Sequence, residues 1–273
     1  PGLTVVQGDV RDIDAVPMKG VDALIHLANV ANDPCGDLNA KLVWEVNALA
    51  TMALVEKAIE NGTGQFIHAS SGSVYGVKDE DQVTEDLSLV PISDYNKTKM
   101  ISERVLLSYA DRIAVQIIRP ATVCGYSPRT RLDVSVNMLT MQAVKNGLIT
   151  VFGGKQTRPN IHIQDITGVF IHFLGHQRFT GIYNAGFENI SIMDIAKRAS
   201  ERVQARIEVT ESNDPRSYRL NSDKLLATGF SPQSGVDDAV REIIGAARNG
   251  TLVDDDNGYN IRTMKRLMEA GQL

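Results

Sequence analysis

Cysteine, aromatic residues and long apolar runs are all scarce in this sequence of 273 residues. The two cysteines, Cys35 and Cys124, form no C-x-x-C pair, and the five histidines show no metal-ligand spacing. A disulfide framework or a metal site is therefore not expected, whereas a reducing, cytoplasmic compartment is. No apolar stretch reaches the roughly 18 residues of a membrane span, so we expect no membrane partner. A formal net charge of −5 gives no reason to expect a nucleic-acid partner.

What the sequence does contain is an alternation of strand and helix patterns. Short apolar runs of strand length cover residues 3–6, 23–27, 65–69 and 114–118. A helical period runs through residues 42–60 and ends at Asn61-Gly62, and a second helix begins near Tyr95. Strands that are apolar throughout and alternate with helices are typical of a parallel sheet covered on both faces. We predict an α/β fold built on a doubly wound parallel sheet.

A Y-x-x-x-K pattern at the start of the second helix provides the first chemical signal. Residues four apart lie on one helical face, so Tyr95 and Lys99 should sit together. A lysine ammonium beside a phenol lowers the tyrosine pKa from its usual value near ~10, which would make Tyr95 an acid or base near neutral pH. A serine from the end of the strand at 65–69 could hold a substrate oxygen beside it. Taken alone, this short motif is better explained by a packed tyrosine and a solvated lysine.

Further short motifs follow one another in the order found in a known family. They are G-D-V-R-D at 8–12, D-A-L-I-H-L-A at 22–28, E-V-N at 45–47, A-S-S-G-S-V-Y-G at 69–76, R-P-A-T-V-C-G at 119–125 and the segment 153–165. Together with Tyr95 and Lys99 they resemble the extended short-chain dehydrogenase/reductase family, in particular its NAD-dependent nucleotide-sugar epimerases and dehydratases. The resemblance covers nearly the whole chain. It implies a Rossmann-like sheet domain with a smaller α+β substrate domain.

One family segment does not occur in this sequence. Members open with a strand, a G-x-x-G-x-x-G turn, a helix and a second strand, whereas this chain begins at Pro1, just before the pattern of the third family strand. We therefore expect an N-terminally incomplete member that lacks roughly 50 residues, the size of a β-α-β nucleotide-binding unit. On its own, the chain would then be inactive.

The resemblance also divides the chain into two parts. The dinucleotide-binding domain would comprise residues 1–124 and 161–186, and the substrate-binding domain residues 125–160 and 187–273. A helix at 165–174 and a strand at 181–184 would return to the sheet. The second part would contain a helix at 136–146 and the segments 150–152, 191–205, 207–210 and 235–247. The acidic segment 254–258 is expected to be a solvated loop.

The family motifs assign roles to individual residues. Ser71, Tyr95 and Lys99 would be catalytic, and family spacing selects Ser71 over Ser70 and Ser73 because it lies three residues before Val-Tyr-Gly. The expected contacts of the cofactor NAD are Asp9, Val10, Leu27, Ala28, Asn29, Asn47, Tyr95, Lys99 and Pro120. Asn29 replaces the more common alanine or glycine, and Asn47 is most simply a buried amide that supports the active end of the sheet.

The expected partner is a nucleotide-diphosphate sugar. Its contacts would be Ser73, Thr122, Arg158 and Arg216. The two arginines would hold the diphosphate, because a guanidinium matches it with two parallel hydrogen bonds. Arg129 and Arg131 are better explained as solvated residues. The segment Asn32-Asp33-Pro34 is explained equally well by a sugar contact and by an Asx-type turn. Three histidines in apolar strand contexts should be core residues with satisfied ring nitrogens: His26, His68 and His162.

These assignments imply an NAD-dependent nucleotide-sugar epimerase, similar to the 4-epimerases, that oxidises a sugar hydroxyl transiently. The alternatives are an NAD(P)-dependent nucleotide-sugar reductase or dehydratase, a non-catalytic protein on the same fold, and an inert fragment of it. Family dehydratases carry a glutamate immediately before Val-Tyr-Gly, where this sequence has Ser73, which disfavours dehydration. A homodimer is a further expectation. The sequence does not indicate which sugar or nucleotide is bound, or whether NAD or NADP is preferred.

Overall fold

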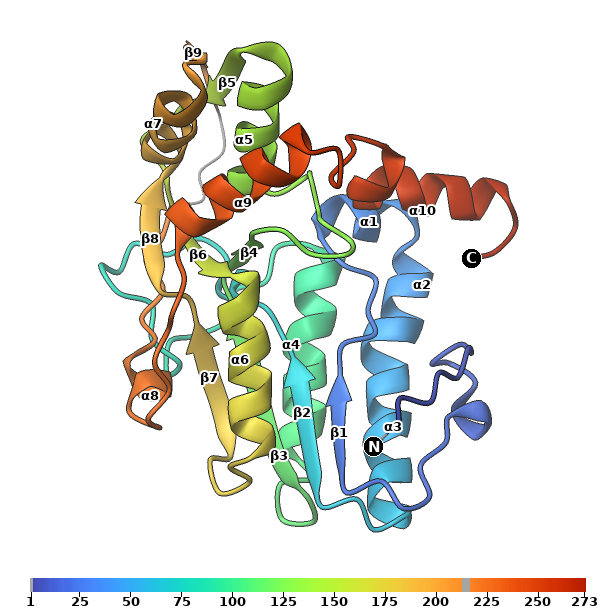
Figure 1. Cartoon of the computed structure of the whole chain (residues 1–273). Helices are drawn as coiled ribbons and strands as arrows, with labels where there is room; N and C mark the ends of the chain where they lie inside the picture. The colour runs from blue at the N-terminus through green and yellow to red at the C-terminus, as the bar shows by residue number, and fades with distance from the viewer. Residues whose placement is uncertain (1, 213–216) are drawn as a thin grey trace.

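A four-stranded parallel sheet forms the centre of the chain, for which the computed structural model describes residues 2–212 and 217–273. The strand order is β1 (Ala23–His26), β2 (Gln65–Ala69), β3 (Ala114–Pro120) and β7 (Gly181–Ala185). Successive residues of β2 face opposite sides, with Phe66 in the core cluster under α3 (Ala50–Glu60) and α4 (Asp94–Leu107) and Ile67 in the cluster under α6 (Ile163–Leu174). Figure 1 shows these helices on the two faces. The predicted doubly wound parallel sheet is confirmed.

The helix predicted over residues 42–60 is a continuous run of three segments. It consists of α2 (Ala40–Trp44), the π-helical turn η2 (Glu45–Leu49) and α3. Inside η2, the Asn47 amide donates to the Val30 carbonyl oxygen (3.1 Å) and its Oδ1 accepts from the Val30 N–H (2.9 Å). The side chain is fully buried, so the interpretation of Asn47 as a supporting amide agrees with its contacts. It fixes the chain where it leaves β1.

Two smaller sheets lie beyond the carboxyl ends of β3 and β7. One contains β4 (Thr122–Cys124), β6 (Thr157–His162) and β8 (Glu188–Ser191), and the other pairs β5 (Leu148–Phe152) with β9 (Arg206–Thr210). Three helices enclose a separate apolar core with them: α5 (Ser135–Asn146), α7 (Ile192–Val203) and α9 (Val236–Arg248). The helices expected at 136–146 and 165–174 and the strand at 181–184 are confirmed within one or two residues.

Short elements complete the described chain. They are η1 (Ile13–Ala15), α1 (Asp33–Leu38), η3 (Gly72–Tyr75), α8 (Asp223–Leu226), η4 (Asp256–Gly258) and α10 (Asn260–Glu269). Helix α10 packs through Met264 against Cys35 and Leu42, so residues far apart in sequence lie side by side at α1 and α2 (Figure 1). In the described ranges, no helix is both long enough and apolar enough to cross a membrane.

One sequence prediction of secondary structure is wrong, and a second holds only in part. Residues 3–6 form no strand, and Leu3 and Val5 are 91% and 81% exposed, because no neighbouring strand provides a hydrogen-bonding ladder for them. The solvated loop expected at 254–258 is found in part: Asp255, Asp256 and Asn257 are exposed, whereas Gly258 is buried. Asp254 accepts hydrogen bonds from Lys145 (2.6 Å) and Tyr259 (2.8 Å).

Candidate active site

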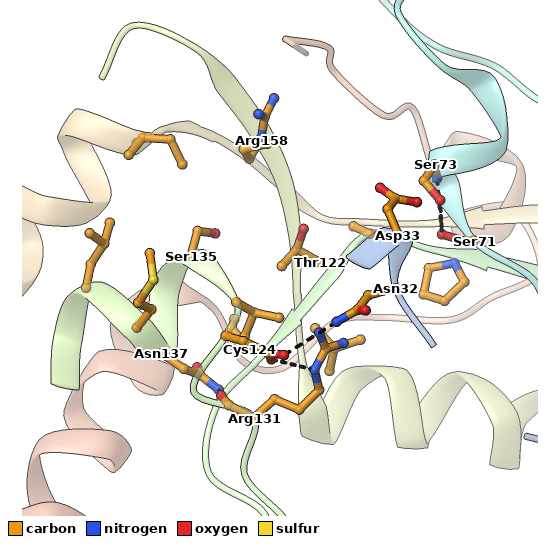
Figure 2. Close-up of a pocket in the computed structure, with 18 of the residues that line it drawn as sticks. Asn32, Asp33, Ser71, Ser73, Thr122, Cys124, Arg131, Ser135, Asn137 and Arg158 are labelled. Carbon is orange, nitrogen blue, oxygen red and sulfur yellow. Dashed lines mark hydrogen bonds and ion pairs between the residues drawn. The ribbon is translucent and has the colours of Figure 1, made fainter. Parts of the chain in front are cut away.

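A cavity of about 730 Å³ opens beyond the carboxyl end of β3. Ser71, Tyr95, Pro120, Thr122 and Arg158 all line it, and they come from segments that are distant in sequence. Figure 2 shows the serines, Thr122 and Arg158 among its lining residues. The carboxyl edge of a doubly wound parallel sheet is where such folds bind ligands. The structure therefore brings together part of each predicted set, catalytic, cofactor and substrate.

The two serines of the site belong to one hydrogen-bonded chain. Ser71 caps η3, accepting from the Ser73 N–H at 3.2 Å, and its Oγ lies 2.7 Å from Ser73 Oγ. The Ser73 hydroxyl donates to Asn96 Oδ1. Since the one proton of Ser73 is used in that bond, Ser71 is the donor between the serines. Ser71 can exchange this bond for one to a substrate oxygen without leaving Ser73 without a partner.

Tyr95 enters the cavity from the first turn of α4. Ser93 caps this helix by accepting a hydrogen bond from the Asn96 N–H at 3.2 Å. The cap fixes the start of the helix and thereby the position of Tyr95 in its first turn. Burial raises the pKa of Tyr95, while a hydrogen bond with Ser71 and the charge of Arg131 act to lower that pKa. The sequence predicted a pKa lowered by Lys99, and this is wrong. The Lys99 ammonium lies 6.0 Å from the Tyr95 ring centroid, and it donates to the Ala69 carbonyl.

Lys99 lies one helical turn further along α4, and it is buried. Only 3% of it is exposed, so the alternative of a solvated surface lysine is excluded. Burial lowers the pKa of Lys99 to about 7, and the nearby Glu103 carboxylate opposes that fall. A lysine in this state can hold or release a proton close to neutral pH.

The predicted cofactor residues separate into two groups. Tyr95 and Pro120 line the cavity, with Lys99 behind them. The other group lies at or near the end of β1 and consists of Leu27, Ala28, Asn29 and Asn47. Leu27 is 58% exposed, and Asn29 Oδ1 is buried without a hydrogen-bond partner. An exposed edge with an unsatisfied oxygen beside it fits a ligand with hydroxyl groups, as the ribose of NAD has.

Asp9 and Val10 lie in the segment that precedes β1 and do not line the cavity. Asp9 is already paired, because the Arg11 guanidinium contacts its carboxylate at 2.6 Å and the Arg11 N–H donates to it at 2.8 Å. The same bonds hold the pKa of Asp9 below its usual range. An adenine contact by Asp9 remains a prediction.

Of the predicted substrate residues, Ser73, Thr122 and Arg158 line the cavity, and Arg216 lies outside the described residues. Arg129 and Arg131 line it as well. Arg129 is exposed, as expected of a solvated residue, whereas Arg131 is only partly exposed. Arg131 is held by Asp133, whose Oδ1 lies 2.8 Å from its Nε. The cavity thus contains three arginines, which suits an anionic ligand.

The segment that follows β1 forms the expected Asx-type turn, and its contact with a sugar remains a prediction. Asn32 caps α1 by accepting the Cys35 N–H at 3.1 Å, with a left-handed φ of 73°, and it also lines the cavity. Asp33 beside it accepts from the Ser93 hydroxyl at 2.5 Å, which connects this segment to the start of α4.

Other lining residues were missed by the sequence reasoning: Ser135, Asn137, Phe152, Gln156, Tyr218 and Ile261. Phe152 was visible as an apolar strand residue, but its 56% exposure depends on how β5 ends. Ile261 gave no signal, because its position depends on the docking of α10. Asn137 accepts from the Gly125 N–H at 3.0 Å and donates to the Arg131 carbonyl at 2.8 Å, so it shapes the cavity wall.

The sequence predicted that the ring nitrogens of all three core histidines are hydrogen-bonded, and this is wrong for one of them. His26 Nε2 lies 2.9 Å from Thr51 Oγ1, and His162 contacts Glu242 at 3.0 Å. His68, however, is fully buried with neither ring nitrogen hydrogen-bonded, and burial holds its pKa well below the usual range.

Burial also raises the pKa of the Cys124 thiol to about 12, so this cavity residue is no nucleophile. Within the described part of the chain, no three potential metal ligands gather.

The family is established by comparison with known proteins. Residues 1–186 match the description "NAD dependent epimerase/dehydratase family". The chain belongs to this family. Its resemblance to the extended short-chain dehydrogenases/reductases is thereby confirmed, and the family is one of NAD-dependent enzymes.

Individual relatives include both reaction types named in the family description. The chain is 29% identical to an uncharacterized UDP-glucose epimerase, YtcB, of Bacillus subtilis over 65% of this chain and 57% of that protein. It is 25% identical to the UDP-glucuronic acid 4-epimerase of Bacillus cereus, solved with UDP-glucuronic acid and NAD, with a TM-score of 0.76 over 89% of this chain and 79% of that one.

A dTDP-glucose 4,6-dehydratase, DesIV of Streptomyces venezuelae, shares the fold with a TM-score of 0.78 at 24% identity, over 89% of this chain and 79% of that one. The chain spans about half the length, 48% and 57%, of two curated relatives that it matches.

Proposed function

We propose that this chain provides the catalytic site of an NAD-dependent nucleotide-sugar 4-epimerase. The observation that carries the proposal is the convergence of Ser71 and Tyr95, with Lys99 behind them, on a cavity that also holds Arg158. NAD, when bound, accepts a hydride from the sugar carbon and returns it to the other face. The residues of this chain supply the proton transfer and the positioning.

Tyr95 is the proposed acid/base. As the phenolate, Tyr95 would take the proton of the reacting sugar hydroxyl, and as the phenol it would return that proton when the hydride is delivered to the opposite face of the carbon. Ser71 would donate a hydrogen bond to the same sugar oxygen, and Lys99 would stabilise the phenolate of Tyr95. Arg131 contributes as well, because its charge already acts to lower the Tyr95 pKa.

The substrate we propose is a nucleoside-diphosphate sugar, in keeping with the relatives solved or named with UDP sugars. Arg158 would hold the diphosphate, with Thr122 beside it, while the sugar turns over at Tyr95. We further propose that the core formed by α5, α7 and α9 belongs to a substrate-binding domain comprising residues 125–160 and 187–273. A homodimer and a cytoplasmic location remain predictions.

Dehydration is the second candidate, because a solved relative is a dehydratase. It is the weaker one. The position before Val-Tyr-Gly is Ser73, whose hydroxyl is bonded to Asn96, and a hydroxyl is a poorer acid/base for removing water than a carboxylate.

The two reactions are separated by incubating the purified protein with NAD and either UDP-glucose or UDP-glucuronic acid, with a parallel incubation that contains NADH. For an epimerase, proton NMR shows a second anomeric signal, and mass spectrometry shows a product of the same mass as the substrate. A dehydratase product is lighter by one water. A product formed only when reduced nicotinamide is consumed would instead identify a reductase.

A further inference from the structure

A buried polar cluster lies behind Tyr95 and Lys99. The Glu103 carboxylate and the Arg119 guanidinium are 1% and 2% exposed, and they form a bidentate pair with Nε–Oε1 and Nη2–Oε2 distances of 2.8 and 2.6 Å. The Ser70 hydroxyl donates to Glu103 Oε1 at 2.5 Å. On the other side, Arg119 Nη1 donates to the Tyr75 hydroxyl at 2.6 Å. The Tyr75 hydroxyl in turn donates to Asn184 Oδ1 at 2.8 Å.

The cluster joins the segments that carry the proposed catalytic residues. Ser70 is the immediate neighbour of Ser71, at the exit of β2. Glu103 lies on the same face of α4 as Tyr95 and Lys99, since the three residues are spaced by four. Arg119 in β3 directly precedes Pro120, which lines the cavity. One carboxylate therefore fixes the rotation of α4 relative to the ends of β2 and β3.

Stability alone is a poor explanation for this pair. Buried ion pairs can often be replaced by apolar side chains without loss of stability, because desolvation offsets their attraction. The position of the charge is more informative. The titratable groups that face Lys99 are Tyr95 and Glu103 from α4, His26 from β1 and His68 from β2. Burial lowers the pKa values of both histidines, so they are neutral near pH 7, and Glu103 is the anion that acts on Lys99.

We propose that Glu103 is a positioning residue for the Tyr95 and Lys99 pair, held in place by Arg119 and Ser70, and that its negative charge favours the protonated form of Lys99 against the effect of burial. The inference rests on the proposed roles of Tyr95 and Lys99. Its test, however, measures the ionisation of Lys99 directly and needs no turnover. A failure of the proposed reaction would therefore leave this measurement interpretable.

The experiment is an NMR titration of protein labelled with ¹³C at lysine Cε, in which the Lys99 signal is assigned by its loss in Lys99→Arg. Glu103→Gln keeps the size of the side chain and removes its charge. We expect the titration midpoint of Lys99 to fall by about one pH unit or more, because an opposite charge nearby favours the protonated form. Glu201→Gln, an exposed change on α7, should leave the midpoint unaltered. An unchanged midpoint in folded Glu103→Gln would overturn the proposal.

Two further variants cover the case in which Glu103→Gln does not fold. Glu103→Gln/Arg119→Gln removes both charges, so no unpaired guanidinium remains in the core. The Lys99 midpoint should fall by less than in Glu103→Gln, because loss of the Arg119 positive charge acts in the opposite direction. Ser70→Ala removes one hydrogen bond but leaves the ion pair, so the midpoint should stay as in the parent protein. A drop in Ser70→Ala as large as in the double variant would assign the effect to packing and contradict a role for the Glu103 charge.

Discussion

Burial acts in opposite directions on the two residues at the centre of the site. It raises the pKa of Tyr95 and lowers the pKa of Lys99 to about 7, so both are driven toward their neutral forms. Near neutral pH, the phenol holds its proton and the amine holds one only part of the time. The arriving sugar hydroxyl, Arg131, Ser71 and the protonated fraction of Lys99 must then stabilise the phenolate. A helix spacing of four residues could not reveal this balance, because it depends on what covers the helix.

Replacing Tyr95 by phenylalanine tests the proton-transfer step. Tyr95→Phe keeps the ring and removes the hydroxyl, so kcat should fall by about 10²–10⁴ while KM changes little. Steady-state kinetics with whichever UDP sugar the NMR assay shows to be converted provides the measurement. Tyr109→Phe removes the hydroxyl of a partly buried tyrosine just beyond the end of α4, away from the cavity, and serves as the control. Turnover within a few-fold of the parent in Tyr95→Phe would remove this residue from the mechanism.

Arg158 is the residue to change for nucleotide affinity. Arg158→Ala removes a charge-assisted contact worth about 1.5–3 kcal/mol per hydrogen bond, so the affinity for UDP should fall roughly 10- to 150-fold. Isothermal calorimetry with UDP measures this without catalysis. Arg248→Ala, which makes the same charge change on the exposed end of α9, should bind UDP normally. Equal affinities in the two variants would place the diphosphate elsewhere in the cavity.

At the scale of elements, the sequence predicted the strands and helices whose residues show a clear local pattern. The apolar runs at 65–69 and 114–118 became β2 and β3, and the Ser93 cap begins α4 close to the predicted start. What failed depends on partners. Residues 3–6 have strand composition but no strand to pair with. Helix α10 was missed although Ile261, Met264 and Met268 recur at helical spacing, and these side chains pack against residues of α1 and α2. In the site, Arg131 needed tertiary information for the same reason.

Helix α10 provides an element-scale test through its buried methionine. Met264→Ala leaves a cavity against Cys35 and Leu42, and we expect a loss of about 2 kcal/mol in the free energy of unfolding. For a chain of this size, that corresponds to a Tm lower by roughly 4–8 °C in a thermal melt. Lys265→Ala, at the next and exposed position, should stay within about 0.5 kcal/mol of the parent. Similar melts for both variants would show that α10 is not anchored there.

At the scale of the whole molecule, buried histidines connect stability to pH. Burial lowers the pKa of His26 to about 4 in the folded protein, whereas its pKa in the unfolded chain is near ~6.5. Between these two pH values the unfolded chain binds more protons than the folded one. Stability from this group is therefore present above pH 6.5 and lost as the pH falls. The pKa of His68 is lowered by burial too, which adds to the same trend.

Urea denaturation at pH 7 and pH 5 measures this contribution. The free energy of unfolding should fall by about 2 kcal/mol between these values because of His26 alone. His26→Gln can still reach Thr51 but cannot titrate, so its loss on acidification should be smaller by about that amount. Identical losses in parent and variant would show that His26 does not stay neutral in the folded protein.

The docking of α10 has a consequence for biosynthesis. Asp133 accepts from the Asn260 N–H at 3.0 Å, the Leu132 N–H donates to the Gly258 carbonyl at 2.7 Å, and Ile261 forms part of the cavity wall. Chains fold from the N-terminal side as they leave the ribosome. The sheet can therefore assemble early, while the ligand cavity is finished only when residues 258–264 have emerged. A nascent chain halted before that point would carry an ordered sheet beside an open, protease-accessible pocket.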